Sequence, residues 1–399
     1  MPRKIIHLDL DAFFCAVEER RKPELHGKAF AVGGSPDERG VVASCSYAAR
    51  LKGVRSAMPM ARALRLCPGL IIVDPDHHTY SEASRHVMDR LHQITPLIEQ
   101  ISIDEAFLDV SDLPEPAEQI ARQLQAQIKK ELELPCSLGI ASNKLVAKIA
   151  TDTGKASAVK DPHYAGRPPC AITVVPPGHE AEFLAPLPAI ALWGIGPKTA
   201  ARLEEDGIHT IGDLASCSQA DLVRRFGKNG FDLAQHARGL DDRPVETSHE
   251  IKSVSREVTF AKDVADQAVL DHTLRELAGD VGHSLRKEGL TGSTVKLKLR
   301  WSDFTTLTRQ VTLPQPTDLD EIIYSSASDL FNKAWRPRRP VRLIGVGVSG
   351  FGRHVQQLSL WDNTPEKQMQ QQKSTRLQRA VDELHKKYGD KILKRGTDG

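Results

Sequence analysis

The sequence predicts an α+β protein of several domains, and three observations support that fold class. The first 170 residues carry signals in the order strand, hairpin, helix, strand, helix, which is the ferredoxin-like α+β pattern. Proline-rich segments then introduce a mostly helical block, and a polar linker after residue 240 leads to a second α+β block. The 399 residues are 40% hydrophobic and 27% charged, which suits roughly two to three soluble globular domains.

Local periodicity predicts the elements of the first block. Residues 5–10 form an apolar strand, and residues 12–21 form a helix that ends before Pro23. Residues 101–110 predict a hairpin interrupted at Asp104 and Glu105. The remaining elements are short strands at 29–34 and 40–46, a helix at 117–132, a strand at 136–141 and a helix capped by Asn143 that ends near residue 151.

Proline, glycine and alternation mark the later blocks. Pro168-Pro169 and Pro176-Pro177 bracket a short strand, and residues 178–240 are mostly helical with tight glycine turns. Residues 250–352 alternate with period two around one clear helix at 269–287. A Gln-rich tail follows, with a helix-like segment at 375–395 to which we assign no function.

Composition argues against several classes of protein. No apolar run approaches the roughly 20 residues of a membrane span, and the N-terminus lacks the pattern of a signal peptide. The six cysteines form no CxxC pair and no zinc-spaced set with histidine. We therefore expect a cytoplasmic protein with reduced thiols and no membrane partner. The net charge of +2 does not by itself indicate nucleic acid, so such a partner must be inferred from where charge gathers.

Paired carboxylates are the chemical centre of the sequence. Asp9 ends the first apolar strand, and Asp104-Glu105 stand between two apolar strand halves. Carboxylates in such surroundings are costly unless a hard divalent cation binds them. Two cations roughly 4 Å apart would clamp the attacking and leaving oxygens of a phosphoryl transfer. Period two puts Asp11 on the face of Asp9. The spacing alone favours the alternative, in which Asp104-Glu105 is a polar hairpin turn and Asp9 a strand-end residue.

Three motifs around these residues stand in a recognisable order. They are HLDLDAFF at 7–14, YAAR at 47–50 and SIDEA at 102–106. Their order and spacing resemble the Y family of DNA polymerases, most of all its bacterial DNA polymerase IV branch. The resemblance covers roughly residues 3–352. It implies a right-hand polymerase, with a palm at 1–12 and 77–170, small fingers at 13–76, a helix-hairpin-helix thumb at 171–241, a linker at 242–250, an α+β little finger at 251–352 and a tail at 353–399.

The resemblance also implies a role for each matching residue. Asp9, Asp104 and the backbone carbonyl of Leu10 would ligate two Mg²⁺ ions, which Mn²⁺ can replace. Glu105 would lie beside the primer 3′-hydroxyl as the catalytic residue. The family does not use the side chain at the position of Asp11 as a ligand, so period two alone overstates its role.

Four further positions match residues that handle the incoming nucleotide. Phe14 matches the steric gate, whose ring leaves no room for a 2′-hydroxyl, although its residue type equally suits a core position like that of Phe13. Tyr47, Arg50 and Lys155 match contacts to the triphosphate. After Lys155 the sequence ASAVK replaces the usual Pro/Asn/Gly turn, so the conformation of 156–171 is not predicted.

Two regions carry candidate DNA contacts. Gly194, Gly196 and Lys198 introduce a helix as in a helix-hairpin-helix, where a helix N-terminus holds a phosphate, although a plain interhelical turn shares this pattern. Lys296, Lys298 and Arg300 alternate with apolar residues, so one face of a strand presents a basic row. Such a row suits a DNA backbone, as in the family's little finger, or merely solvent.

The tail carries one short apolar segment. Residues 357–361 (QLSLW) resemble the peptide by which bacterial polymerases dock on the ring-shaped sliding clamp, or β clamp. The docking side chains would be Gln357, Leu358, Leu360 and Trp361. Packing of this pentapeptide on the protein's own surface is the alternative.

These expectations combine into one hypothesis. The chain would be a monomeric, template-directed DNA polymerase that adds deoxynucleoside triphosphates to a primer on DNA, with low fidelity, in translesion synthesis. No block remains for a proofreading exonuclease. A nucleotidyl cyclase shares the two-metal palm but has no need of residues 178–352. A non-catalytic DNA-binding scaffold would be expected to lose some of the carboxylates, Phe14 or Arg50, and all are present.

Overall fold

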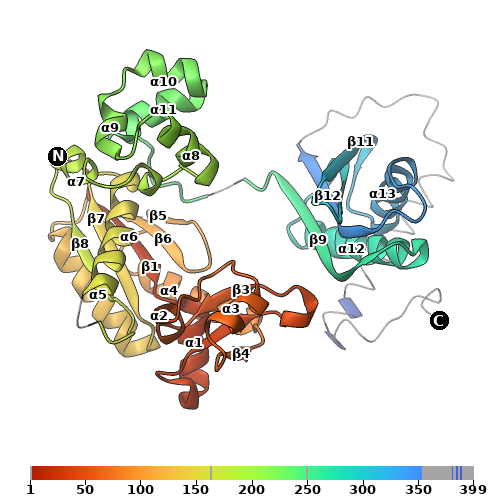
Figure 1. Cartoon of the computed structure of the whole chain (residues 1–399), viewed down its shortest axis with the longest axis horizontal. Coiled ribbons are helices and arrows are strands. Elements are labelled where there is room, and N and C mark those ends of the chain that lie inside the picture. The colour runs from red at the N-terminus through yellow and green to blue at the C-terminus, as the bar shows by residue number, and fades with distance from the viewer. Residues whose placement is uncertain are drawn as a thin grey trace. The chain divides into compact units, whose positions relative to one another are not determined.

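The computed structural model describes residues 2–161, 164–248 and 250–352, together with Ala380, Glu383, Leu384, Lys387 and Tyr388. The chain divides into two compact units, residues 1–249 and 250–399, each with helices and sheets of its own (Figure 1). The QLSLW segment and nearly all of 375–395 lie outside the described residues. Within the described part of the chain, no helix is long and apolar enough to cross a membrane.

A five-stranded sheet is the centre of the first unit. Its order is β5-β6-β1-β7-β8, with β1 in the middle and antiparallel to both neighbours, and with β8 parallel to β7. The strands are β1 (Ile5–Leu10), β5 (Ile98–Gln100), β6 (Glu105–Asp109), β7 (Cys136–Ala141) and β8 (Ile172–Val174). The middle position buries every residue of β1, so a polar group on that strand must find a partner inside the protein.

Helices cover both faces of this sheet. Ile6, Leu8 and Leu10 share a core with α1 (Phe13–Arg21), α4 (His77–His92) and α5 (Ala117–Leu132). Because side chains alternate along a strand, Ile5, His7 and Asp9 point to the opposite face. That face is covered by α6 (Lys144–Lys160), whose apolar residues pack with Ile5.

A smaller subdomain follows α1. It holds the sheet β3-β2-β4, made of β2 (Phe30–Gly33), β3 (Val42–Cys45) and β4 (Ile71–Val73). The subdomain also contains α2 (Tyr47–Leu51), α3 (Met60–Leu66) and the short 3-10 helices Pro23–Leu25 and Pro36–Glu38. Its core is separate and small, built mainly from alanine, valine, cysteine and methionine side chains.

Short helices make up the rest of the first unit, and Figure 1 shows α8 to α11 gathered together. They are α7 (Glu180–Leu184), the 3-10 helix Ala189–Ala191, α8 (Pro197–Glu205), α9 (Ile211–Ser216), α10 (Gln219–Phe226) and α11 (Lys228–His236). Their apolar residues continue the core beneath α6, where the ring centroids of Trp193 and Phe107 lie 5.7 Å apart.

The second unit is a four-stranded antiparallel sheet with two helices on one face. Its strands are β9 (Ser253–Val264), β10 (Gly292–Trp301), β11 (Thr306–Thr317) and β12 (Val341–Phe351), in the order β11-β10-β12-β9. The helices are α12 (Gln267–Lys287) and α13 (Asp320–Ala334). Val295, Leu297 and Leu299 of β10 are buried in the core that the helices cover, so the alternate residues of β10 face away from them.

Three expectations from the sequence need correction. Residues 250–352 hold two helices, α12 and α13, where the sequence predicted one clear helix at 269–287. The predicted strand half at 101–103 is a turn, since β5 ends at Gln100 and β6 begins at Glu105. The helix after Asn143 does not end near residue 151 but continues to Lys160. Gly154 lies inside that helix because β8 approaches it closely: a Cβ atom there would stand 2.2 Å from Oγ1 of Thr173.

Candidate active site

Strand pairing brings the predicted carboxylates together. Asp9 of β1 and Glu105 of β6 are register partners, so both side chains leave the sheet on the face toward α6. The amide of Leu10 donates to the carbonyl of Asp104 at 3.0 Å, which places the end of β1 against the turn that carries Asp104.

A serine fixes the turn that carries Asp104. The hydroxyl of Ser102 accepts from the amides of Asp104 and Glu105, at 3.2 and 3.1 Å, and donates to Oδ1 of Asp104 at 2.6 Å. Side-chain-to-backbone bonds of this kind compete with a strand ladder, which explains why the apolar Ile101 and Ile103 do not extend the strand. Asp104 and Glu105 are therefore held at a defined point although both remain partly exposed.

Two lysines of α6 neutralise the carboxylates. Nζ of Lys155 lies 2.6 Å from Oδ1 of Asp9, and Nζ of Lys148 lies 2.9 Å from Oε1 of Glu105. Burial nevertheless raises the pKa of Asp9 to about 7, with Glu105 and Asp104 adding to the rise and Lys155 opposing it. The charged form of Asp9 is therefore costly at this buried position even with Lys155 beside it.

Asp11 does not line the site as a further exposed acid. Its side chain is fully buried and accepts from the Ser137 hydroxyl at 2.9 and 3.0 Å and from the Cys170 amide at 3.0 Å. It also accepts from the Tyr47 hydroxyl at 3.4 Å, and Nζ of Lys155 lies 3.5 Å away. Asp11 therefore connects the carboxylate sheet to two of the predicted nucleotide contacts.

Tyr47 and Arg50 sit on one turn of α2, which Ser46 caps by accepting from the amide of Ala49. The Arg50 guanidinium lies over the Tyr47 ring at 4.9 Å and donates to the carbonyl of Cys45 at 3.2 Å. Burial and the nearby Asp11 raise the pKa of Tyr47, so its hydroxyl stays protonated. Asp11 thus contacts Tyr47 and Lys155, and Arg50 joins them through the Tyr47 ring.

Phe14 lies in the first turn of α1, just beyond the carboxylate strand. Ala12 adopts a left-handed conformation, φ 49°, and turns the chain directly from β1 into the helix. Phe13 is 2% exposed and belongs to the core, as its residue type predicts, whereas Phe14 is only partly buried. The ring of Phe14 stacks on Tyr80 of α4, with centroids 4.3 Å apart and planes inclined by 14°.

The predicted phosphate contacts of the helical region form a loop that opens α8. Gly194 has φ +101°, and Gly196 precedes the helix whose first residue is Pro197. Both glycines are exposed, and a Cβ atom at either would meet nothing within 4 Å, so the space beside their Cα atoms is open. Lys198 follows in the first turn and is exposed.

The basic row of β10 lies on the sheet face away from the helices. Lys296 is exposed, while Lys298 and Arg300 are partly covered. Nζ of Lys298 pairs with Oε2 of Glu257 at 2.6 Å, and Nε of Arg300 donates to Oγ1 of Thr306 at 2.9 Å. An acid on β9 thus offsets one member of the row, which the sequence did not reveal.

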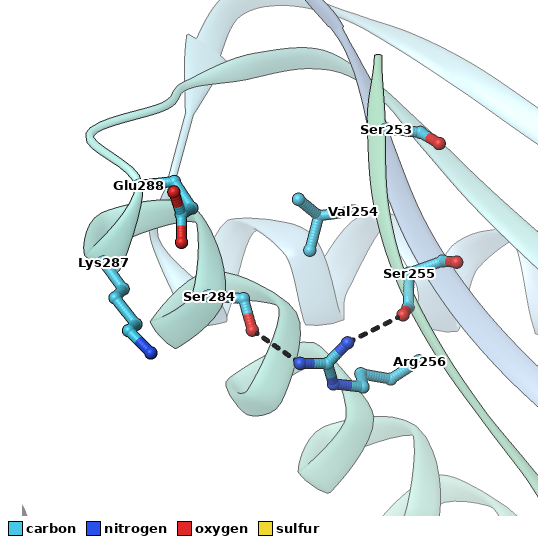
Figure 2. A pocket seen from close by; sticks show the side chains of 7 residues that line it. All are labelled: Ser253, Val254, Ser255, Arg256, Ser284, Lys287 and Glu288. Atoms are coloured by element: carbon cyan, nitrogen blue, oxygen red, sulfur yellow. Dashed lines mark hydrogen bonds between the residues drawn. The ribbon is translucent and has the colours of Figure 1, made fainter. Parts of the chain in front are cut away.

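A polar pocket of about 390 Å³ lies in the second unit, between the start of β9 and the end of α12 (Figure 2). Arg256 spans it, donating to Oγ of Ser284 at 3.0 Å and to the carbonyl of Ser255 at 3.2 Å. The predicted catalytic side chains belong to the first unit, so this pocket does not contain them.

In the described part of the chain, no three His, Cys, Asp or Glu side chains stand close enough to hold a metal ion. Asp9 and Glu105 each face a lysine instead. The predicted clamp peptide, with Gln357, Leu358, Leu360 and Trp361, lies outside the described residues.

Several interactions around the predicted site residues were not identified from the sequence. Lys148 is seven residues before Lys155, a spacing that places both on one helix face, but the helix was expected to end between them. Asp11, Glu257 and Glu18, which bonds the hydroxyl of Tyr80, act through contacts distant in sequence. No local pattern could have identified those contacts.

Together, a ferredoxin-like sheet with adjacent carboxylates, a small subdomain bearing Tyr47 and Arg50, a helical thumb and a separate α+β unit define the class of right-hand nucleic-acid polymerases. Residues 8–152 match the impB/mucB/samB family, and residues 251–360 match the C-terminal domain of that family. Residues 190–241 match the thumb domain of DNA polymerase-iota.

Similar proteins agree over most of the chain. The DNA polymerase IV of Desulfatibacillum aliphaticivorans is 43% identical over 348 residues, which are 86% of this chain and 84% of that protein. The DNA polymerase IV of Dehalococcoides mccartyi (strain CBDB1) is 38% identical over 398 residues, 99% of this chain and 97% of that protein. Among solved structures, a Y-family polymerase chimera of Dbh and Dpo4 has a TM-score of 0.76 at 27% identity and covers 87% of this chain and 99% of that one.

The chain belongs to the Y family of DNA polymerases. It is a DNA-directed DNA polymerase of the translesion kind, and the fold class predicted from the sequence is confirmed. The family's enzymes depend on metal ions and lack a proofreading exonuclease.

Proposed function

We propose that this polymerase extends a DNA primer by two-metal phosphoryl transfer at Asp9, Asp104 and Glu105. The observation that carries the proposal is the register pair Asp9–Glu105, with Asp104 bonded through its carbonyl to Leu10. In this proposal the palm is 1–12 and 77–170, the fingers 13–76, the thumb 171–241 and the little finger 251–352, with 242–250 linking the last two.

The donor set fits hard divalent cations. Asp9, Asp104 and the carbonyl of Leu10 offer only oxygen, which Mg²⁺ prefers and Mn²⁺ accepts. Burial raises the pKa of Asp9 because its charged form is poorly solvated, and a bound cation would stabilise that charged form. Two ions would lower the cost of charge on the attacking and leaving oxygens. Glu105 would lie at the primer terminus. Lys148, which pairs with Glu105 in this structure, would offset part of the negative charge there.

The residues around Asp11 would hold the nucleotide. Arg50 and Lys155 supply the charge that a triphosphate needs, and the protonated Tyr47 hydroxyl can donate to it. Lys155 reaches Asp9 and Asp11 in this structure, so it stands at the boundary between the carboxylates and the triphosphate. Phe14, whose ring is stacked on Tyr80, would close the space beneath C2′ of the sugar.

DNA contacts would come from both units. The loop Gly194–Gly196 with Lys198 can bind a phosphate through backbone amides at the start of α8. Lys296, Lys298 and Arg300 present charge that suits a DNA backbone. Such contacts are independent of sequence, as a polymerase that copies any template requires.

The test is extension of a labelled primer on a template of known sequence. We expect Mg²⁺-dependent addition of the nucleotide that the template specifies, and continued addition past at least some members of a panel of defined lesions. Chelation of divalent ions should stop the reaction. Absence of addition by the folded full chain would refute the proposal, and addition that ignores the template would refute its template-directed part.

We further propose that residues 357–361 tether the enzyme to a sliding clamp in the cytoplasm, where the six free cysteines stay reduced. A second contact raises the effective concentration of a monomeric polymerase at the primer end. Leu358→Ala with Trp361→Ala should leave clamp-free synthesis intact and remove stimulation by the cognate clamp. Undiminished clamp binding by the double variant, measured by surface plasmon resonance, would exclude the peptide.

A further inference from the structure

The ring of Phe14 stacks on the ring of Tyr80, and the Tyr80 side chain is itself held in place by other residues. Tyr80 is fully buried, and its ring lies nearly parallel to that of Phe14 at 4.3 Å. His77 meets both rings edge-on, with centroids 5.9 Å from Phe14 and 6.0 Å from Tyr80. Offset and edge-on contacts of this kind prefer defined geometries, so the position of Tyr80 determines that of Phe14.

A buried carboxylate holds the far end of Tyr80. The Tyr80 hydroxyl donates to Oε1 of Glu18 at 2.8 Å, and Glu18 is fully buried. Glu18 is four residues after Phe14 on α1, so the two side chains occupy the same helix face. One helix therefore holds the tyrosine twice, by the face of its ring and by its hydroxyl.

The carboxylate is itself anchored. Arg21 donates to Oε1 of Glu18 at 3.2 Å, and Nζ of Lys22 lies 3.1 Å from Oε2. Arg21 also pairs at 3.0 Å with Asp76, the residue that caps α4 by accepting from the amide of Thr79. A buried carboxylate is costly unless it is paired, and here the pairing joins α1 to the start of the helix that carries Tyr80.

We propose that Glu18 is a positioning residue for sugar selection, because it fixes Tyr80 and thereby the ring of Phe14. This inference rests on the proposed role of Phe14 as the steric gate. A ring excludes a hydroxyl only by occupying its space, so selectivity depends on how far the ring can retreat. Glu18 and Tyr80 set that limit without touching the nucleotide.

The experiment measures the ratio of kcat/KM for dCTP to that for CTP, opposite a template guanine, in the full-length enzyme. Tyr80→Phe keeps the stacked ring and removes the bond to Glu18, and we expect the ratio to fall roughly 10-fold. Glu18→Gln keeps an acceptor but loses the charge that Arg21 and Lys22 hold, and we expect a fall of about threefold. The fall should come from a rise in kcat/KM for CTP, since simple loss of stability would lower both values.

A double variant and a matched control sharpen the result. In the double variant Glu18→Gln with Tyr80→Phe, the dCTP/CTP ratio should be no lower than in Tyr80→Phe alone, because Glu18 acts through the tyrosine hydroxyl. Tyr324→Phe removes the same kind of bond, a tyrosine hydroxyl to Asp271 at 2.8 Å, in the second unit. It should leave the ratio at the parent value.

Phe14→Ala separates failure of this inference from failure of the gate. If Phe14→Ala lowers the ratio while Tyr80→Phe and Glu18→Gln stay within about twofold of the parent, Phe14 is the gate and the role of Glu18 is overturned. Additive losses in the double variant would also overturn it. If Phe14→Ala itself leaves the ratio unchanged, the proposed gate fails, and the inference fails with it.

Discussion

The carboxylate site of the first unit and the basic face of the second handle charge in opposite ways. Asp9 is 8% exposed, has a strand partner on each side and carries a raised pKa. On the Lys296–Arg300 face, Lys296 is exposed, Lys298 and Arg300 are partly exposed, and the ion pair of Lys298 with Glu257 is partly exposed as well. Buried charges are expensive and specific, whereas exposed ones are screened and largely additive.

This contrast assigns different tasks to the two regions. In the first unit, function should depend on where each group stands, so one substitution should act as a switch. In the second, function should depend on summed charge, so substitutions should act gradually and with a strong dependence on salt.

The largest effect belongs to Asp104. We expect Asp104→Ala to lower the rate of single-nucleotide addition by at least about 1,000-fold, because the reacting centre would lose one of its proposed metal ligands. Asp112→Ala, which removes an exposed acid a few residues beyond β6, is the control and should retain the parent rate. Near-normal addition by folded Asp104→Ala would remove this residue from the chemistry.

The second effect is graded. Replacing Lys296, Lys298 and Arg300 by glutamine should weaken binding to any primer–template. It should also reduce the slope of log affinity against log salt by about 0.9 for each phosphate that the protein no longer neutralises. Lys287→Gln, on the end of α12, is a control for general loss of charge from this unit. A salt slope equal to that of the parent would mean that the row only faces solvent.

Glu257 allows the opposite change. Glu257→Gln frees Lys298 from its partner at 2.6 Å, so we expect DNA affinity to rise by about threefold and the salt slope to steepen. Fluorescence anisotropy over a range of salt concentrations measures both. Weaker binding by this variant would show that the pair supports the DNA-binding surface instead of competing with it.

The smallest effect concerns His7, a neutral group inside the first unit. Burial, with Lys148 and Lys155 nearby, lowers the pKa of His7 well below its ordinary 6.5. The unfolded chain therefore binds a proton below pH 6.5 that the folded chain refuses, and stability falls as pH falls, by at most about 1.4 kcal/mol per pH unit. Urea unfolding at pH 7.5 and 5.5 should show a smaller loss for His7→Gln than for the parent. Equal losses would contradict a neutral buried His7.

Strong local periodicity made part of this fold predictable. The strands at Ile5–Leu10 and Cys136–Ala141 and the helix at Ala117–Leu132 match the expected bounds, because each has an uninterrupted pattern ended by a turn or cap. The strand predicted at 101–103 was wrong because Ile101 and Ile103 mimic a strand, while the hydroxyl of Ser102 closes a turn. A glycine such as Gly154 is typical of a helix end, but here it lies within the helix and allows β8 to approach closely.

The candidate site also has a part that the sequence predicted and a part that it did not. Asp9, Asp104 and Glu105 drew attention as acids in apolar surroundings, and the resemblance of their motifs to the Y family assigned their roles. The sheet register places Asp9 beside Glu105. Period two placed Asp11 on the face of Asp9, yet its side chain is bonded to Ser137, Cys170 and Tyr47, which come from three distant segments. Glu18 and Glu257 look like ordinary helix and strand charges until folding supplies their partners. Contacts between distant segments decide what a buried charge does, and a local pattern does not contain them.

The most direct measurement compares Asp104→Ala with the triple Lys296/Lys298/Arg300 variant in two assays, DNA affinity and single-turnover nucleotide addition at saturating DNA. We predict a crossed result. Asp104→Ala should bind within a few-fold of the parent and fail to add a nucleotide, whereas the triple variant should bind weakly and add nucleotides at a near-parent rate once saturated. Parallel loss of both activities in both variants would contradict the division of labour between the two units.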